Sequence, residues 1–315
     1  MELKTLSLSE LNAQSEKKSF KLEDAELSRP SRELLWAPAE LPPLCHLQEL
    51  RRARAEERLR YNQLYALGVL EQFIWLESRI LCRVIERVLK DRTLSSELRT
   101  GLGYFYDEEV KHSELFWRLL QLAEPALYPN REFHFLKENS LAIKAVESLV
   151  EAPSLFVVWV WMTIFFEERT LDFSKRYVLT DRRAPNTLDR SFVKVHKLHM
   201  QDELRHFMMD VHLLEKYYDN SHALKRRLAC RMFKIILERL SNPKMMSVAY
   251  VAQLDKEFPG FSRRAGEALL KARSSLRENI EFRKVSMSSE STPRTYALLH
   301  KYDETRPLRG LFVEA

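Results

Sequence analysis

The sequence has 315 residues, with 51 Lys and Arg against 45 Asp and Glu, so its formal net charge is +6. Glycine is scarce, with 6 residues, which favours helices over a turn-rich β protein. The three cysteines are far apart and form no CxxC pair, which argues against a disulfide framework and favours a reducing, cytoplasmic setting. The small positive excess is spread over a long chain and gives no reason to expect nucleic acid.

No segment of the sequence is predicted to cross a membrane. The N-terminus, MELKTLSLSELNAQ, lacks the basic and apolar regions of a signal peptide. The most apolar window, LFVVWVWMTIFF (155–166), is shorter than the roughly 20 residues that a bilayer span needs. We therefore interpret it as a buried core helix.

The first half of the chain is predicted to be mostly helical. Residues 1–44 lack sustained periodicity and are expected to form an N-terminal arm. The proline-free segment 46–123 has apolar residues at helical spacing, which predicts two long helices in a hairpin, broken near 90–97. A loop over 124–134 and a short helix over about 138–151 follow.

The second half continues in the same way. Pro153 opens a long helix to about residue 179, because proline is well tolerated in the first helical turn. A loop at 180–189 leads to a helix over about 189–218, and two or three more helices fill 223–283. No strand-like alternation is present, so we expect one all-α domain.

The domain limits follow from these elements. The all-α domain is expected to span 45–284, after the arm. Polar, turn-rich sequence (VSMSSESTPR) begins near residue 285, and we expect 285–315 to form a C-terminal tail.

The segment HKLHMQDELRHFMMD (196–210) is rich in side chains that bind metals or protons. His199, Glu203 and His206 are spaced i, i+4 and i+7, so one helix can direct all three at one point. Taken alone, the pattern fits a solvated helix face equally well. His196 lies one turn earlier, and we interpret it as a supporting or structural residue. Asp210, one turn later, either accepts the other imidazole N–H of His206 or is solvated.

A second segment, YFYDEEVKHSELF (104–116), contains Glu109 and His112 as an ExxH pair. Phe105 and Phe116 share its face, so the pair points inward, where a carboxylate and an imidazole need partners. Two ExxH helices indicate a di-metal carboxylate bundle, which takes one further Glu from each of two other helices.

Each of the two remaining helices offers two candidate glutamates. Glu77 lies in the middle of an apolar stripe and Glu71 at its margin, so we favour Glu77. Glu167 shares its face with apolar and small residues, whereas Glu168 lies beside charged ones, so we favour Glu167.

The ligand elements thus occur in the order Glu, ExxH, Glu and HxxxExxH, one on each of four long helices. Carboxylates that bridge two cations suit iron or manganese, with imidazole completing each site. The third histidine would give one metal two imidazoles and the other one. The predicted ligands are Glu77, Glu109, His112, Glu167, His199, Glu203 and His206.

This order, with its extra histidine, resembles the ferritin-like di-iron oxygenases of the p-aminobenzoate N-oxygenase type over about residues 60–215. The stretch HMQDELRH is the closest match, including Asp202 before Glu203. The resemblance implies a ferritin-like four-helix bundle core with additional helices. It also implies two irons held by the seven residues above, and oxidation of small organic substrates with O₂, which in some members are arylamines.

We therefore expect an oxygenase of the monooxygenase type, with two iron ions (or manganese), O₂ and a small organic substrate such as an amine. The sequence has no flavin, nicotinamide or Fe–S motif, so a separate electron donor is expected. No membrane or nucleic-acid partner is expected, and a homodimer is left open. Two rival hypotheses are a ferritin-like iron-storage protein and a non-catalytic helical interaction protein.

Overall fold

The computed structural model describes residues 6–137, 141–150, 156–240 and 244–314. The described residues form helices and contain no β-strand, only two isolated bridges, Leu35–Leu188 and Ser288–Val313. The all-α prediction is therefore confirmed. Among the described residues, no helix combines the length and apolarity that a membrane span requires.

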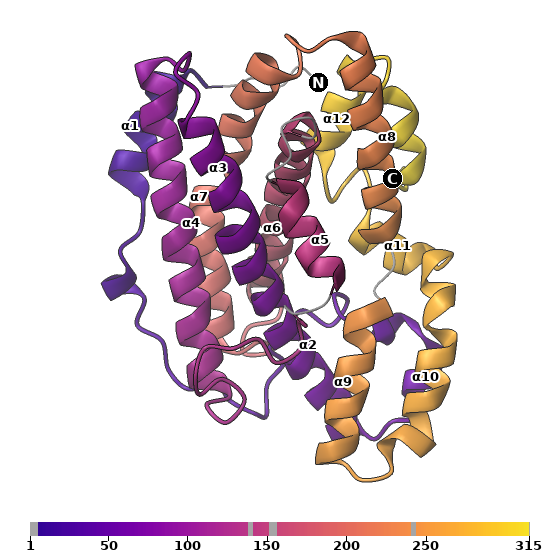
Figure 1. Cartoon of the computed structure of the whole chain (residues 1–315). Coiled ribbons are helices and arrows are strands. Elements are labelled where there is room, and N and C mark those ends of the chain that lie inside the picture. Colours follow the sequence, from indigo (N-terminus) through magenta and orange to yellow (C-terminus); the bar gives the residue numbers. More distant parts are fainter. Residues whose placement is uncertain (1–5, 138–140, 151–155, 241–243, 315) are drawn as a thin grey trace.

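Four long helical stretches form a central bundle (Figure 1). They are α2 (Ala55–Trp75), which continues through a π-helical turn (Leu76–Leu81) into α3 (Cys82–Leu89), then α4 (Ser96–Ala123), α6 (Phe156–Arg183) and α7 (Arg190–Tyr217). α4 packs against both α2 and α7, and α7 packs along α6. The predicted hairpin and the two later long helices are present. The predicted start of α6 at Pro153 lies outside the described residues.

The starts of two bundle helices follow from the local sequence. Ser95 caps α4, because its side chain accepts a hydrogen bond from the N–H of Leu98. Asp189 caps α7 by accepting from the N–H groups of Ser191 and Phe192. These caps satisfy donors that have no partner inside a helix, and they set where each helix begins.

The π-helical turn interrupts the first long helix. The N–H of Cys82 donates to the C=O of Glu77, five residues back instead of four. Such a turn adds a residue to one helical turn and rotates the chain that follows it. Glu77 lies inside this turn, and its C=O accepts the five-residue hydrogen bond.

The N-terminal segment contains a helix that periodicity did not predict. α1 (Leu8–Lys18) begins with a capping box between Ser7 and Glu10 and packs against α4 and α7. Only Leu11 and Ser15 of this helix are buried. Two buried positions are too few to give a periodic pattern of apolar residues, so the sequence predicted an N-terminal arm here and no helix.

Further helices surround the bundle. They are α5 (Leu141–Val150), α8 (Ala223–Leu240), α9 (Lys244–Glu257), α10 (Glu267–Ala272), α11 (Ile280–Ser286) and α12 (Pro293–Lys301), with a second π-helical turn at Ser262–Gly266. Short 3₁₀ turns lie at Leu22–Asp24, Pro43–His46, Gln48–Arg52, Arg273–Arg277 and Arg306–Leu311. α8 and α12 pack on α6, and α9 packs on α2.

The C-terminal segment is more ordered than the predicted tail. α12 lies against α6 and buries Leu298 and Leu299. α9 approaches α2 so closely that a Cβ atom at Gly68 would collide with the hydroxyl of Tyr250. Both contacts join segments that are distant in sequence.

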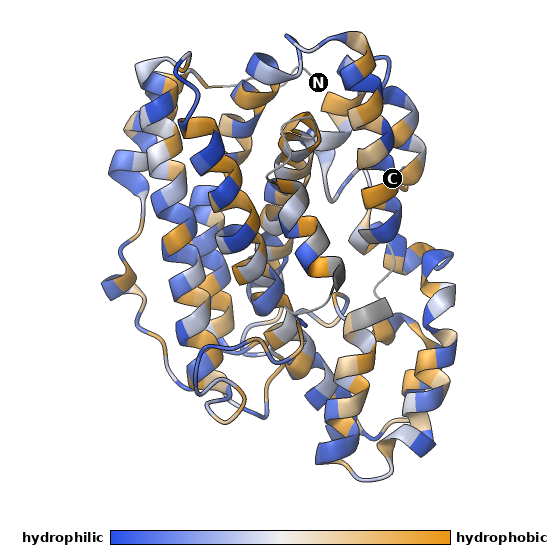
Figure 2. Ribbon diagram, viewed as in Figure 1, coloured by the Kyte–Doolittle hydropathy of each residue, from blue (hydrophilic) through white to orange (hydrophobic). Residues whose placement is uncertain are grey.

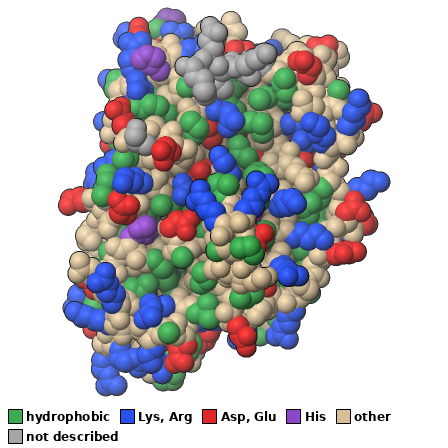
Figure 3. All heavy atoms as spheres, turned by 180° about the vertical axis from the view of Figure 1, so that it is seen from behind, with side chains coloured by type: hydrophobic (Ala, Val, Ile, Leu, Met, Phe, Trp, Pro, Cys, Tyr) green, Lys and Arg blue, Asp and Glu red, His purple; other side chains and the backbone are tan. Residues whose placement is uncertain are grey.

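Buried apolar residues form two clusters, one toward each end of the bundle. Figure 2 shows the hydrophobic residues along its helices, and Figure 3 shows that both charge signs are spread over the opposite face of the molecule. All four long helical stretches cross from one cluster to the other, first at 74–76, directly before Glu77, and then at 105–115 on α4, 165–173 on α6 and 195–207 on α7. These crossings contain six of the seven predicted ligands, so the two apolar cores hold a polar layer between them.

Candidate metal centre

All seven predicted ligands meet in this polar layer, and each is at most 2% exposed. Their ligand atoms form two overlapping groups, within each of which all atoms lie within 4.8 Å of one another. The first group is Glu109, His112, Glu203 and His206, and the second is Glu77, His112 and His199. Glu167 belongs to neither group, but its Oε2 borders the first, 3.5 Å from Nδ1 of His206.

Glu203 lies at the middle of the centre. Its Oε1 is 3.1 Å from Nε2 of His199, 3.6 Å from Nδ1 of His112 and 3.5 Å from Nδ1 of His206. One carboxylate oxygen therefore faces all three imidazoles. A carboxylate in this position suits a bridge between two cations.

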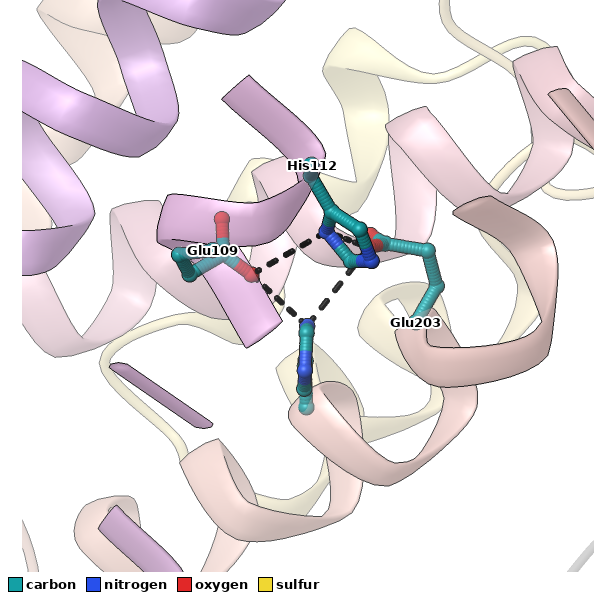
Figure 4. Close-up of side chains that lie close together, drawn as sticks. Glu109, His112 and Glu203 are labelled. Atoms are coloured by element: carbon teal, nitrogen blue, oxygen red, sulfur yellow. Dashed lines mark ion pairs between the residues drawn. The ribbon is translucent and has the colours of Figure 1, made fainter. Parts of the chain in front are cut away.

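Glu109 faces the same space from α4. Its Oε1 lies 2.8 Å from Nδ1 of His206 and 3.8 Å from Nδ1 of His112. Figure 4 shows the side chains of Glu109 and His112 from α4 and of Glu203 from α7 pointing toward one another. At the far side, Oε1 of Glu77 lies 3.1 Å from Nε2 of His199.

Most of the atoms that face this space lie close to one another, but none of those that follow makes a hydrogen bond of acceptable geometry. They include both oxygens of Glu109, one oxygen each of Glu77, Glu167 and Glu203, and the Nδ1 atoms of His112 and His206. Buried polar atoms without partners are costly, and interiors rarely contain so many together. Lone pairs of carboxylates and imidazoles converging on one space fit a pair of metal ions.

The carboxylates also strain one another electrostatically. Burial raises the pKa of Glu77 well above its usual range, and the nearby Glu109 and Glu203 raise it further. Burial and the same two neighbours raise the pKa of Glu167 in the same way. Burial acts to raise the pKa of Glu203 too, but the surrounding histidines lower it below its usual range. Cations among these groups would relieve the repulsion.

Two of the three histidines are held from behind by carboxylates. Nε2 of His112 lies 3.1 Å from Oδ2 of Asp202, and Nε2 of His206 lies 2.8 Å from Oε2 of Glu108. Nη2 of Arg205 joins the two carboxylates, at 2.5 Å from Asp202 and 2.7 Å from Glu108. Such partners set the tautomer and orientation of a ligating imidazole.

We call the charged residues behind these histidines, Glu108, Lys111, Asp202 and Arg205, the outer layer. The outer layer was not predicted from the sequence. Asp202 and Arg205 do lie off the ligand face, as the helical wheel indicates, but they are buried against the neighbouring helix. The prediction that Asp210 accepts the second N–H of His206, or is solvated, is wrong on both counts: Glu108 takes that position and Asp210 is 1% exposed.

A sequence signal for the outer layer exists in retrospect. Each of its residues directly precedes a predicted ligand, and the next residue along a helix is turned by about 100°. A charged residue one position before a buried ligand therefore reaches the adjacent helix–helix contact. The pairs are Glu108 and Glu109, Lys111 and His112, Asp202 and Glu203, and Arg205 and His206.

His199 is held differently. Its Nδ1 lies 3.0 Å from Oγ of Ser174, which also lies 3.1 Å from Nδ1 of His196. The ring of His196 stacks on Tyr177 with centroids 3.7 Å apart, and burial lowers the pKa of His196 well below its usual range. His196 is thus neutral and lies outside the two groups of ligand atoms. One turn before Ser174 on α6, Oγ1 of Thr170 donates a hydrogen bond to Oε2 of Glu203 at 2.6 Å.

The two rejected glutamates anchor other parts of the fold. Glu71 accepts hydrogen bonds from Tyr128 and from the N–H groups of residues 134–136, and burial raises the pKa of Glu71 to about 6. Glu168 accepts from the N–H groups of Arg294 and Thr295, at 2.8 and 2.6 Å, and so caps α12. Neither carboxylate belongs to the two groups of ligand atoms.

Aromatic rings close the centre. Phe105 stacks on His206 with centroids 4.1 Å apart, and Phe20 stacks on His112 at 5.8 Å. Phe73 lies 5.5 Å from His199. Phe20 is the second residue after α1, so the N-terminal segment covers one side of the centre. A surface hollow of about 430 Å³ lies at the C-terminal helices, and none of the seven predicted ligands lines it.

The chain matches the family model described as P-aminobenzoate N-oxygenase AurF over residues 4–291. The match includes the N-terminal segment and most of the outer helices. It is therefore wider than the stretch of about 60–215 that the motifs cover. A search of the curated proteins found no match.

Proposed function

Because the chain belongs to the P-aminobenzoate N-oxygenase AurF family, we propose that its buried centre binds two iron ions and uses O₂ to oxidise a small organic substrate. Members of this family are di-iron oxygenases, and the chain is accordingly an oxidoreductase. We assign the seven residues at the centre as metal ligands and an amine nitrogen as the atom that is oxidised.

The observation that carries this proposal is the convergence of buried, unpartnered lone pairs on one space. The charge of the centre supports two divalent cations. Its four carboxylates carry four negative charges when ionised, and imidazoles ligate in their neutral form. Two divalent ions balance that charge, whereas one would leave an uncompensated excess in a buried place.

The outer layer needs no further cation. Asp202 and Glu108 carry two negative charges, and Lys111 and Arg205 carry two positive ones. Nζ of Lys111 lies 3.1 Å from Oδ2 of Asp202, and Arg205 contacts both carboxylates. Added positive charge is therefore required among the seven predicted ligands at the centre.

The ligands divide into two ends and a shared middle. Glu77 and His199 form one end, and Glu167 and His206 form the other. Glu203 faces both ends, and Glu109 lies between His206 and His112, so we assign these two as the bridging carboxylates. His112 belongs to both groups of ligand atoms.

Iron bound here would supply the redox chemistry that activates O₂. The protein's own residues fix the ligands and keep the site dry. Asp202 and Glu108 accept the outward N–H groups of two imidazoles, and Phe105 and Phe73 pack on the rings. Exclusion of water from the centre limits side reactions during oxidation of the substrate.

The electron balance calls for a separate donor. Inserting one oxygen atom of O₂ into an amine N–H bond, while the other oxygen atom leaves as water, consumes two electrons and two protons from outside. The sequence has no flavin, nicotinamide or Fe–S motif. We therefore propose that a separate electron carrier reduces the centre.

The test begins with metal-free protein loaded anaerobically with Fe(II), followed by elemental analysis and O₂ uptake with a chemical reductant and a panel of arylamines. We expect about two irons per chain and a product with one added oxygen atom on nitrogen, identified by mass spectrometry. A single zinc, or no iron after loading, contradicts the metal assignment. Oxygen added only to carbon contradicts the amine assignment while leaving the centre intact.

A further inference from the structure

The three histidines of the centre are supported by different chemistry. His112 and His206 face it through Nδ1, and each has its Nε2 against a buried carboxylate. His199 faces it through Nε2 and has its Nδ1 against the neutral hydroxyl of Ser174. The support of His199 therefore differs in both geometry and charge.

The two histidines beside Ser174 determine which of them accepts a hydrogen bond from its hydroxyl. If Nε2 of His199 offers its lone pair to a metal, Nδ1 carries the proton and donates to Oγ of Ser174. The single hydroxyl proton of Ser174 is then free for Nδ1 of His196, 3.1 Å away. These tautomers are assigned from the network. The opposite direction would leave Nδ1 of His199 unprotonated and Nε2 protonated, which cannot ligate.

His196 lies in an apolar enclosure that gives it nothing else to bind. Its ring stacks on Tyr177 and touches the edges of Phe73 and Phe173. It is fully buried, and its Nε2 has no hydrogen-bond partner. A residue that only filled this space would be apolar, because an unpaired buried N–H costs free energy. The presence of an imidazole here is explained by its Nδ1 atom, which accepts a hydrogen bond from the hydroxyl of Ser174.

We infer that Ser174 and His196 are positioning residues that hold His199 in the tautomer and orientation for metal binding, and that the metal position beside Glu77 and His199 is the more weakly held of the two. The inference rests on the proposed role of His199 as a ligand. A carboxylate partner raises the basicity of a ligating imidazole, and a neutral hydroxyl does so less. His112 and His206 both have carboxylate partners, so of these three histidines only His199 has a neutral partner, and it is expected to be the least basic.

Co(II) binding tests this inference without reference to activity. Metal-free protein is titrated anaerobically with Co(II), and the visible ligand-field absorption gives both stoichiometry and geometry. Wild-type protein should bind about two Co(II) per chain in two steps. In Ser174→Ala the weaker step should lose about 10- to 100-fold in affinity and its absorption should shift, while the tighter step is unchanged.

Two further variants separate positioning from packing. His196→Phe fills the space without an acceptor and should weaken the same step, whereas His196→Asn retains an acceptor near the Nδ1 position and should restore most of it. Ser113→Ala is the matched control, since Ser113 is buried on α4 and its hydroxyl has no hydrogen-bond partner. It should bind Co(II) as the wild type does, and circular dichroism should report the same helix content for all four variants.

The outcomes are distinguishable. Wild-type binding and spectra in both Ser174→Ala and His196→Phe would overturn the inference and leave the metal centre standing. An equal loss of both steps would assign these residues to general packing and would also overturn it. Failure of the wild type to bind two Co(II) ions would remove the proposed function and this inference together.

Discussion

Oδ2 of Asp202 lies 3.1 Å from Nε2 of His112, on the side of the ring opposite the atom that faces the centre. Asp202 comes from α7 and His112 from α4, so this hydrogen bond joins two helices at the level of the ligands. It orients the imidazole of His112 from across the contact between the two helices. The same logic applies to Glu108 and His206, with the helices exchanged.

Loss of a bridging carboxylate should remove metal without unfolding the protein. We expect Glu109→Ala and Glu203→Ala to lose most bound iron and all oxygenase activity, because we assign each of these carboxylates as a bridge between the two metal ions. Circular dichroism should show the helix content of the wild type. Glu114→Ala provides a control on α4, since Glu114 is paired with Arg118 and Arg131 at the surface. Normal iron content in either ligand variant would contradict the assigned bridges.

The crowding of carboxylates predicts a pH dependence of the metal-free protein. Burial and neighbouring carboxylates raise the pKa of Glu77 in the folded state above the unfolded value of 4.5. The folded state then binds more protons than the unfolded state, so this contribution to stability is lost as pH rises above about 4.5 toward the folded pKa. Metal-free Glu77→Gln should therefore exceed the wild type in stability, by a margin that grows between pH 5 and 8.

Urea unfolding of both metal-free proteins at several pH values measures this margin. A margin that shrinks as pH rises would contradict the crowding of charge at the centre. The metal-loaded wild type should show the reverse trend, because metal binding requires deprotonated ligands and strengthens with pH. Glu77→Gln should not share that gain.

Substitutions of the neighbouring residues Glu167 and Glu168 should have different effects on metal content and stability. Glu167→Gln should lose at least one metal ion and keep its stability. Glu168→Gln should keep its metal but lose about 1–3 kcal/mol of stability, because the carboxylate holds two backbone N–H groups of α12. Iron content, urea unfolding and limited proteolysis of the C-terminal segment distinguish the two. Metal loss in Glu168→Gln alone would reverse the assignment.

Arg205 should matter for both stability and metal binding. In Arg205→Met, two buried carboxylates lose their shared cation, which should cost about 3–5 kcal/mol of stability. Metal affinity should also fall about 10- to 100-fold, since Asp202 and Glu108 would no longer be fixed behind their histidines. Arg118→Met serves as a control, because Arg118 is 41% exposed. Loss of stability with unchanged metal affinity would limit Arg205 to a structural role.

Part of the centre is readable from helical spacing. The ExxH pair at Glu109 and His112, and the triple at His199, Glu203 and His206, are local patterns, because residues three, four or seven apart share a helix face whatever surrounds them. An apolar stripe on the same face indicates that this face is buried. The all-α fold and the four ligand elements were therefore predicted from the sequence.

Other features depend on contacts between segments. Glu77 lies in a π-helical turn, which shifts the register of a regular helical wheel, and Glu71 is equally buried but binds the loop after α4. Glu168 is buried by α12, which lies over a hundred residues later in the chain. Burial alone does not separate a ligand from an anchor, since both need partners.

The sequence by itself determined which ligand types this protein has, their order and the helix face on which each set lies. The apolar stripes also favoured Glu77 over Glu71 and Glu167 over Glu168. Only the tertiary structure decided what Glu71 and Glu168 bind instead, and that Asp202, Glu108 and Ser174 hold the histidines of the centre. The physical reason is that helical periodicity is set by backbone hydrogen bonds within a few residues, whereas a hydrogen bond between helices requires two segments to meet. The packing of α1 on α4 and α7, and of α12 on α6, was decided in the same way, because neither helix has enough buried positions of its own to reveal it.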